Sequence, residues 1–402
     1  MPNQVEALKH RPEHEPFDRP AWIELSMGNL AHNFHEIQQT VGGKRMICMV
    51  KANAYGHGAR EIAPQLEKLG ADAFGVVSVG EARELREAGI TQDILIVNYV
   101  PPFAIEEAVK LDATITLRDK GVLQAVNVAA KKQHKTAKVQ VHIDTGMHRE
   151  GVWPPEAGVE LVALIQQYEN VELDGIYTHF ATADEVDLSF SRQQLALFNR
   201  CLDDIEAGEI TLPRFIHAAN SGAVLQLPET HRDAGRFTAV RPGIVLYGLS
   251  AGDGFAYPFT PKPVLSLKAR LISVKDIPAD DSVGYARTWR AERNSRVGLI
   301  TLGYADGFAR SFSNTGHVLI HGYRVPVVGR VSMDQTILDL TDFPDIQLDE
   351  EVVVIGQQGN EQIRLEDWAQ ATGTIVNDVV TRLNATRLPR VIVNEVSYGI
   401  RS

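Results

Sequence analysis

One lysine follows directly after a continuously apolar run. Residues 46–50 lead into Lys51, and the chain continues Ala-Asn-Ala-Tyr-Gly-His-Gly. Burial at the end of such a strand disfavours the charged form of the amine, which lowers its pKa and frees the nitrogen to attack a carbonyl. Taken alone, Lys51 is better explained as a lysine whose ammonium group reaches solvent at the rim of the fold. Its interpretation therefore depends on what the neighbouring segments supply.

Two further polar residues follow later apolar runs. Arg149 closes a glycine-containing loop after residues 139–143, and a planar guanidinium suits the recognition of a carboxylate. His179 follows residues 173–178, where a buried structural histidine is an equally good interpretation. These two residues are candidates for binding an anionic substrate.

Small residues follow the last two apolar runs of this region. Asn220-Ser221-Gly222 and Arg241-Pro-Gly243-Ile244 offer short side chains and accessible backbone amides. Such amides, together with a helix N-terminus, can hold a phosphate group without a lysine. We call these two segments the phosphate cradle.

The elements that must position these residues are short apolar runs that alternate with longer amphipathic stretches. Eight runs are predicted to be strands: 45–50, 73–77, 94–97, 113–117, 139–143, 173–178, 214–218 and 239–246. Strands that alternate with helices predict a parallel sheet, and eight units in about 200 residues favour a closed (β/α)8 barrel of the TIM type. An open Rossmann-like sheet is the alternative, and the lack of a GxGxxG motif after the first strand disfavours it.

In such a barrel the C-terminal ends of all strands surround one mouth. Lys51, Arg149, His179 and the phosphate cradle would then lie together. An amine nucleophile beside a phosphate site meets the needs of pyridoxal 5′-phosphate, which carries both an aldehyde and a phosphate. Each feature is weak by itself, but their placement in register on successive strands is specific.

The chain changes character after Ser250. Six further strands are predicted at 264–277, 295–302, 317–320, 325–331, 335–340 and 351–355, with helices only at 365–372 and 375–383. Turn signals such as Asp306-Gly307 separate the strands, which indicates a mainly antiparallel β domain. The expected organisation is a flexible tail (1–19), a barrel domain (20–250, with a leading strand and helix at 21–34) and a β domain (251–402).

Composition limits the class of protein. Of 402 residues, 44% are hydrophobic and 23% are charged, which excludes a fibrous or mostly disordered chain. The net charge of -11 argues against nucleic-acid and membrane partners. Cys48 and Cys201 lack metal-ligand spacing and indicate a reducing compartment, so we expect a cytoplasmic protein without a metal site.

Several segments together resemble alanine racemase. They are 49–58, 144–149, 177–181, 220–221 and 240–244, followed in the β domain by 283–289, 303–307 and 329–335. The resemblance runs from about Pro20 to Val393. It implies an isomerase that interconverts L-alanine and D-alanine with pyridoxal 5′-phosphate, as a homodimer with shared active sites that supplies D-alanine for the cell wall.

The resemblance also implies the catalytic roles. Lys51 would carry the cofactor and act as the base on one face of the substrate Cα. Tyr285, reaching in from the other subunit, would be the base on the opposite face. His179 and Arg241 would form a hydrogen-bonded line towards this tyrosine, and Arg241 would face the pyridine nitrogen and leave it unprotonated.

Further contacts are implied in the same way. Those to the cofactor phosphate would come from Tyr55, Asn220, Ser221, Gly243 and Ile244. The substrate carboxylate would meet Arg149 and, from the partner subunit, Met333 and Asp334. Tyr304 would line the substrate channel.

Three positions depart from the family pattern. Many members carry a carbamylated lysine where this chain has His142, so another group must orient Arg149. Ser332 replaces a frequent cysteine before Met333, which should have a mild effect. Thr386 appears where a tyrosine usually narrows the channel, which predicts a roomier mouth.

Other functions remain open at this point. A broad-specificity amino-acid racemase needs the same residues. A decarboxylase of basic amino acids shares the architecture, but it needs an acidic residue at the pyridine nitrogen, where this chain has Arg241. A non-enzymatic carrier of the cofactor would leave Tyr285 without a purpose.

Overall fold

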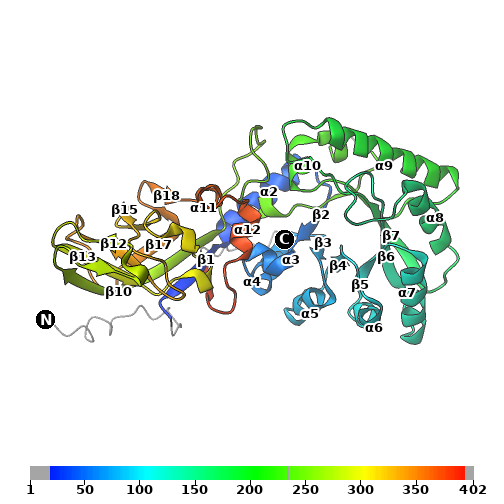
Figure 1. Cartoon of the computed structure of the whole chain (residues 1–402). Coiled ribbons are helices and arrows are strands. Elements are labelled where there is room, and N and C mark those ends of the chain that lie inside the picture. Colours follow the sequence, from blue (N-terminus) through cyan, green and yellow to red (C-terminus); the bar gives the residue numbers. More distant parts are fainter. Residues whose placement is uncertain (1–18, 233–234, 394–402) are drawn as a thin grey trace, which may run out of the picture. The chain divides into compact units, whose positions relative to one another are not determined.

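The computed structural model describes residues 19–232 and 235–393. Contacts between elements divide the chain into two units (Figure 1). The barrel unit is Gly28–Lys262, and the β unit combines the chain from Pro263 with the N-terminal segment that ends at Met27. The tail predicted at 1–19 lies outside the described residues, apart from Arg19. No helix of the described chain is both long and apolar enough to cross a membrane.

The barrel unit contains eight parallel strands in the order β8-β7-β6-β5-β4-β3-β2-β9. They are β2 (Arg45–Met49), β3 (Ala73–Val76), β4 (Asp93–Ile96), β5 (Ala113–Leu117), β6 (Ala137–His142), β7 (Val171–Tyr177), β8 (Phe215–His217) and β9 (Ala239–Val240). Between β9 and β8, the Thr238 amide donates to the Ile216 carbonyl at 2.9 Å and the Arg241 amide to the Ala219 carbonyl at 2.8 Å. These bonds complete the ring, so the predicted (β/α)8 barrel is confirmed.

Most side chains of the ring strands are buried because both faces of the strands are covered. Their inner side chains pack on one another in a cluster of Ile47, Ala73, Leu95, Phe215 and Ala239. Figure 1 shows helices α5 (Val79–Glu87), α6 (Pro102–Lys110), α7 (Lys120–Lys132) and α8 (Pro155–Ile165) along the outer side. The remaining helices of the unit are α2 (Met27–Thr40, of which only Met27 belongs to the β unit), α3 (Lys51–Tyr55), α4 (Ala59–Leu69), α9 (Ser189–Ala207) and α10 (Ser221–Gln226). The mostly apolar strands β2, β3, β4 and β8 are typical of a parallel sheet that is covered on both faces.

The β unit is built around a mainly antiparallel sheet. Its strands are β1 (Ala21–Ser26), β10 (Leu265–Ile277), β13 (Ser295–Ile300), β14 (His317–Ile320), β15 (Tyr323–Pro326), β16 (Thr336–Asp339), β17 (Glu351–Gln358), β18 (Glu361–Ile363) and β19 (Arg390–Val393). A small hairpin joins β11 (Ser282–Val283) and β12 (Trp289–Arg290), and two helices follow, α11 (Leu365–Thr372) and α12 (Val376–Thr381). This confirms the mainly antiparallel β domain.

The first strand of the chain belongs to this β unit. β1 lies between β10, to which it is antiparallel, and β19, to which it is parallel. Residues 21–34, which were expected to precede the barrel and to pack against either domain, are divided between the two units, with β1 in the sheet of the β unit and most of α2 in the barrel unit. The partners of β1 follow it by more than 230 residues, and local sequence does not encode such pairing.

Candidate active site

Lys51 stands at the C-terminal end of β2, at the start of an unusual turn. The four residues after it, Ala52–Tyr55, all have φ between 51° and 53°, so α3 is a left-handed turn. Left-handed helical geometry costs about 1–2 kcal/mol for each non-glycine residue. Such a turn persists only where its surroundings hold it in place.

Two side chains hold this turn. Glu81, from α5, accepts hydrogen bonds from the amides of Ala52 at 2.8 Å and Val77 at 2.7 Å. Asn53 accepts one from the amide of Ala59 at 2.8 Å. Bonds to a carboxylate are among the stronger hydrogen bonds in proteins, so Glu81 ties the ends of β2 and β3 together beside Lys51.

Aromatic residues pack behind the turn. The rings of His57 and Tyr247 stack at 4.4 Å, and Tyr55 lies 5.3 Å from Tyr247. The Tyr247 hydroxyl donates to the Met49 carbonyl at 2.8 Å, which fixes this group against β2. A Cβ at Gly243 would lie 2.5 Å from the Tyr55 hydroxyl oxygen, so only glycine fits beside that tyrosine.

The two segments of the phosphate cradle lie side by side. Asn220 caps α10 by accepting from the Ala223 amide at 3.0 Å, and the Ser221 hydroxyl accepts from the Gly243 amide at 2.9 Å. The structure therefore brings Tyr55, Asn220, Ser221, Gly243 and Ile244 together.

The backbone of the cradle has unused donors. Within the described chain, the amides of Ser221, Gly222 and Ile244 donate no hydrogen bond, although all three residues are buried. Buried amides are normally paired, so this arrangement fits a bound anion such as a phosphate. A Cβ at Gly222 would lie 2.4 Å from the Ala183 carbonyl, so no side chain can occupy that position of the cradle.

Arg241 is the buried cation of the barrel interior. Its Nη2 donates to the Thr178 carbonyl at 2.8 Å and faces Nδ1 of His179 at 3.2 Å, while its Nη1 bonds Nδ1 of His217. A guanidinium only donates, so both imidazoles accept through Nδ1 and carry their proton on Nε2. For His217 this proton bonds the Gln140 side-chain oxygen at 2.8 Å.

Burial and charge set the protonation of this group. Burial lowers the pKa of Arg241 to about 10, so its guanidinium stays charged at neutral pH. Burial and the Arg241 charge lower the pKa values of His179 and His217 well below the ordinary histidine range. Arg241 is thus surrounded by neutral acceptors, and no carboxylate of the described residues pairs with it.

The electrostatic surroundings of Lys51 are positive. Burial lowers the pKa of its amine, and the charges of Arg149 and Arg241 lower it further, whereas Glu81 opposes them. The Arg149 guanidinium makes no hydrogen bond or ion pair with any described residue and is exposed. An available guanidinium near an amine whose pKa is lowered suits an anionic substrate.

His142 does not take over the role of an anion. Its ring stacks on Tyr177 at 4.5 Å, and Tyr177 stacks on His217 at 4.9 Å. Burial, followed by the Arg241 charge, lowers the pKa of His142 to about 3, so the imidazole is neutral. His142 therefore fills the barrel interior as an aromatic ring.

The other predicted site residues lie in the β unit. Tyr304 and Met333 are neighbours, because the Tyr304 amide donates to the Ser332 carbonyl at 3.1 Å and the Ala305 amide to the Met333 carbonyl at 3.0 Å. Tyr285, Met333 and Tyr304 are exposed by 71%, 52% and 43%.

Two segments of the β unit also pack together behind Tyr285. A Cβ at Gly329 would lie 3.0 Å from the Val283 carbonyl, so the segment before Tyr285 packs against the one before Met333. The hydroxyl of Thr386 is engaged within its own turn, where it donates to Asn384 at 2.8 Å.

Two groups of positioning residues were missed by the sequence analysis. Glu81 stands three residues after Ser78, and this S-x-x-E spacing is typical of a helix capping box. The pattern could have marked Glu81 as a cap, but not as a contact of the Lys51 turn. In the β unit, Asp306 and Arg387 lie beside Asp334, and no local pattern relates them.

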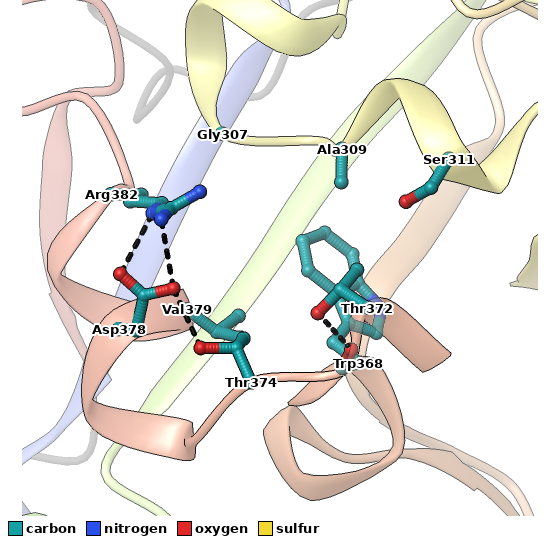
Figure 2. Close-up of a pocket in the computed structure, with 9 residues that line it drawn as sticks. All are labelled: Gly307, Ala309, Ser311, Trp368, Thr372, Thr374, Asp378, Val379 and Arg382. Carbon is teal, nitrogen blue, oxygen red and sulfur yellow. Dashed lines mark hydrogen bonds and ion pairs between the residues drawn. The ribbon is translucent and has the colours of Figure 1, made fainter. Parts of the chain in front are cut away.

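A cavity of about 310 Å3 lies in the β unit (Figure 2), and the amide of Gly307 on its wall donates to the Tyr304 carbonyl at 3.3 Å. Asp378 on its wall pairs with Arg382 and accepts from the Thr374 hydroxyl. Trp368 forms another part of the wall. The charged groups of this cavity satisfy one another, so it is a weaker candidate than the barrel mouth.

Known proteins share both units. Residues 25–251 match the alanine racemase N-terminal domain, and residues 264–392 match the alanine racemase C-terminal domain. An alanine racemase from Methanococcus maripaludis is 38% identical over 377 residues, which cover 93% of this chain and 99% of that relative.

Solved structures agree with these matches. Alanine racemase from Bacillus anthracis with bound L-Ala-P gives a TM-score of 0.87 at 32% identity, covering 95% of this chain and 98% of that one. Histidine racemase from Leuconostoc mesenteroides gives 0.86 at 29% identity, covering 94% and 98%. With both domains matched in order over nearly its whole length, the chain belongs to the alanine racemase family.

Proposed function

We propose that this protein interconverts L-alanine and D-alanine with pyridoxal 5′-phosphate, and that Lys51 and Tyr285 are its two bases. The observation that carries the proposal is the cradle of unpaired buried amides beside an amine of depressed pKa. When bound there, the cofactor supplies an electron-withdrawing ring that makes the Cα proton of the amino acid acidic. Tyr55, Asn220, Ser221, Gly243 and Ile244 would hold its phosphate, and Lys51 its aldehyde carbon.

The two bases are supported by different features. Burial and the nearby arginines favour the neutral amine of Lys51, which can accept a proton at Nζ. Tyr285 would act on the opposite face of Cα through its Oη. His179 supports that role, because its Nδ1 accepts from Arg241 and its Nε2 proton is left to donate to a phenolate.

Arginines would orient the charged groups. The Arg149 guanidinium, which is exposed and bonds no other residue in the described ranges, would bind the substrate carboxylate. Arg241 would face the ring nitrogen of the cofactor as a permanent cation and keep that nitrogen unprotonated. A weaker electron sink favours simple proton exchange over decarboxylation or transamination.

The proposal includes a homodimer with shared sites. Tyr285, Tyr304 and Met333 are large side chains that the single chain leaves exposed, and residues of this kind are enriched in interfaces. In the dimer they would complete the site of the partner subunit, where Met333 and Asp334 approach the substrate carboxylate and Tyr304 lines the channel. A cytoplasmic location is supported by Cys48 and Cys201, which are both buried and free.

Conversion of D-alanine tests the activity. Purified protein loaded with the cofactor should form L-alanine, detected by coupled oxidation, and should release no carbon dioxide. Lys51→Ala should lose all racemisation, and borohydride followed by peptide mass analysis should find the cofactor on Lys51 in the wild type alone. A labelled peptide that lacks Lys51, or activity in Lys51→Ala, would contradict the assignment.

A panel of amino acids distinguishes an alanine racemase from a broad-specificity amino-acid racemase. Alanine should be racemised faster than serine and histidine. Equal rates for all three would favour a broad-specificity racemase.

A further inference from the structure

A fully buried carboxylate organises the segment that carries Tyr304. Asp306 accepts from Nη1 of Arg19 at 2.7 Å, from Nη2 of Arg19 at 2.9 Å and from the Gly303 amide at 3.0 Å. A fourth bond comes from Nε of Arg387 at 2.8 Å. All four contacts lie within the β unit. Because two of the donors are arginines, Asp306 stays charged although its side chain has no contact with solvent.

Arg387 also has a second acidic partner. Its Nη2 pairs with Asp334, so one guanidinium joins the buried Asp306 to the exposed Asp334. Asn384 holds the segment of Arg387 in place, since its side chain donates to the Ala305 carbonyl at 3.1 Å and its amide to the Asp306 carbonyl at 3.2 Å. The position of the Arg387 guanidinium is thus set by the backbone as well as by charge.

The backbone at Met333 and Asp334 has amide groups that are available to bind a ligand. Among the described residues, the amides of Met333 and Asp334 donate no hydrogen bond, and both residues are exposed. Two adjacent free amides can bind a carboxylate. The side chain of Asp334, however, carries the same charge as that ligand and would repel it unless it were neutralised.

We propose that Arg387 is a positioning residue for substrate binding. Its guanidinium, which is anchored on Asp306, neutralises the carboxylate of Asp334. The amides of Met333 and Asp334 can then receive the carboxylate of alanine. The inference rests on the proposed racemase function. In this role Arg387 would act through Asp334 and would not itself touch the substrate or the cofactor. Its effect is on affinity for the carboxylate, whereas the groups that move the proton are elsewhere.

The first test is Arg387→Gln in the cofactor-loaded enzyme. Asp306 keeps both bonds from Arg19 and the bond from Gly303, so the variant should fold, as thermal unfolding can verify. The charge of Asp334 is then uncompensated, and KM for D-alanine should rise about tenfold while kcat changes less than about twofold. Arg387→Lys should recover part of the affinity. A fall in kcat with unchanged KM would overturn the proposal.

A second variant separates neutralisation from a merely structural role. Adding Asp334→Asn to Arg387→Gln removes the repelling charge, so KM should return to within about twofold of Asp334→Asn alone. If Arg387 only maintained the fold, the double variant would remain as impaired as Arg387→Gln. Arg382→Gln is the matched control, because Arg382 pairs with Asp378 elsewhere in the same unit and should leave KM unchanged.

Ionic strength and a non-reacting ligand complete the test. Salt screens exposed charges, so raising it from about 0.05 to 0.5 M should reduce the KM defect of Arg387→Gln. Propionate, which has the carboxylate but no amine, should bind Arg387→Gln about tenfold more weakly than wild type in calorimetry. Equal propionate affinity in both would overturn the inference. A wild type that binds propionate but does not racemise alanine would overturn the proposed function alone.

Discussion

The three imidazoles around Arg241 are neutral for one physical reason. Each is buried in the barrel interior next to a permanent cation, and both conditions disfavour a second positive charge. His142, His179 and His217 therefore act as aromatic rings and fixed hydrogen-bond partners. Their protonation would place uncompensated charges inside the barrel.

This arrangement predicts acid sensitivity. Because the folded-state pKa of each histidine lies below its unfolded value of about 6.5, the unfolded chain binds more protons and the free energy of unfolding falls as pH drops. Each group should cost about 1.4 kcal/mol between pH 7.5 and 5.5, measured by urea unfolding. His142→Asn should reduce this loss by about 1.4 kcal/mol. A stability that is flat over this pH range would contradict neutral histidines.

Some of the site residues could be predicted from the sequence and others could not. Lys51, Asn220, Ser221 and Gly243 could be predicted because each directly follows an apolar run, and barrel geometry then brings strand ends together. Arg387 could not, because its importance comes from Asp306 and Asp334, which lie 81 and 53 residues away in the sequence. Such pairings exist only once the chain is folded.

Among the elements, the left-handed turn Ala52–Tyr55 has the most strained backbone, with four successive non-glycine residues at positive φ. The Ala52 amide is bound by Glu81, and the amides of Ala54 and Gly56 donate to the carbonyls of Val50 and Ala52. The sequence shows a glycine-broken loop at this place, but four successive non-glycine residues give no sign of positive φ. Only the tertiary contacts of the turn explain its geometry.

The turn makes a prediction about stability. Ala52 is exposed and has φ of 51°, so Ala52→Gly should raise the free energy of unfolding by about 1 kcal/mol through relief of strain. The control Ala104→Gly, in the right-handed helix α6, should lower it by about 1 kcal/mol. Chemical denaturation of both variants measures the difference. A destabilised Ala52→Gly variant would show that the turn is not strained.

Glu81 gives a second prediction at this scale. Glu81→Gln keeps one oxygen acceptor but loses the other, so either the Ala52 amide or the Val77 amide is left unpaired. The free energy of unfolding should fall by about 1–3 kcal/mol. Glu84→Gln, on the same helix but outside the turn, should have a smaller effect because its pair with Arg60 is exposed. Equal effects of the two variants would argue against a clamp.

At the scale of the whole molecule, the barrel and the β domain could both be predicted from periodicity. Alternating strands and helices specify parallel pairing, and short strands separated by turns specify antiparallel pairing. The sheet that β1 joins could not be predicted, since the strand carries its hydrophobic pattern but not the identity of its partners. The same limit applies to the contacts of Arg387 with Asp306 and Asp334, which no barrel geometry implies.

The proposed sharing of sites between subunits predicts complementation. Lys51→Ala and Tyr285→Phe should each be inactive or nearly so, but a mixture of the two after subunit exchange should regain up to about a quarter of wild-type activity. Half of the dimers would be mixed, and each mixed dimer would hold one intact site. Co-expression and sedimentation measure both quantities. Full activity in a monomer, or no recovery in a proven mixed dimer, would refute shared sites.

The position of β1 between β10 and β19 has a consequence for how the protein is made. On the ribosome, Ala21–Ser26 emerges first, but its parallel neighbour Arg390–Val393 is translated last. At about 5–20 residues per second, the first strand waits for tens of seconds without one of its edges covered. Meanwhile Gly28–Lys262 is complete and can close its own ring of strands. The order of synthesis therefore favours a folded barrel that carries an unfinished strand at its start, and a chain that stops before residue 390 would leave this edge open to other nascent chains.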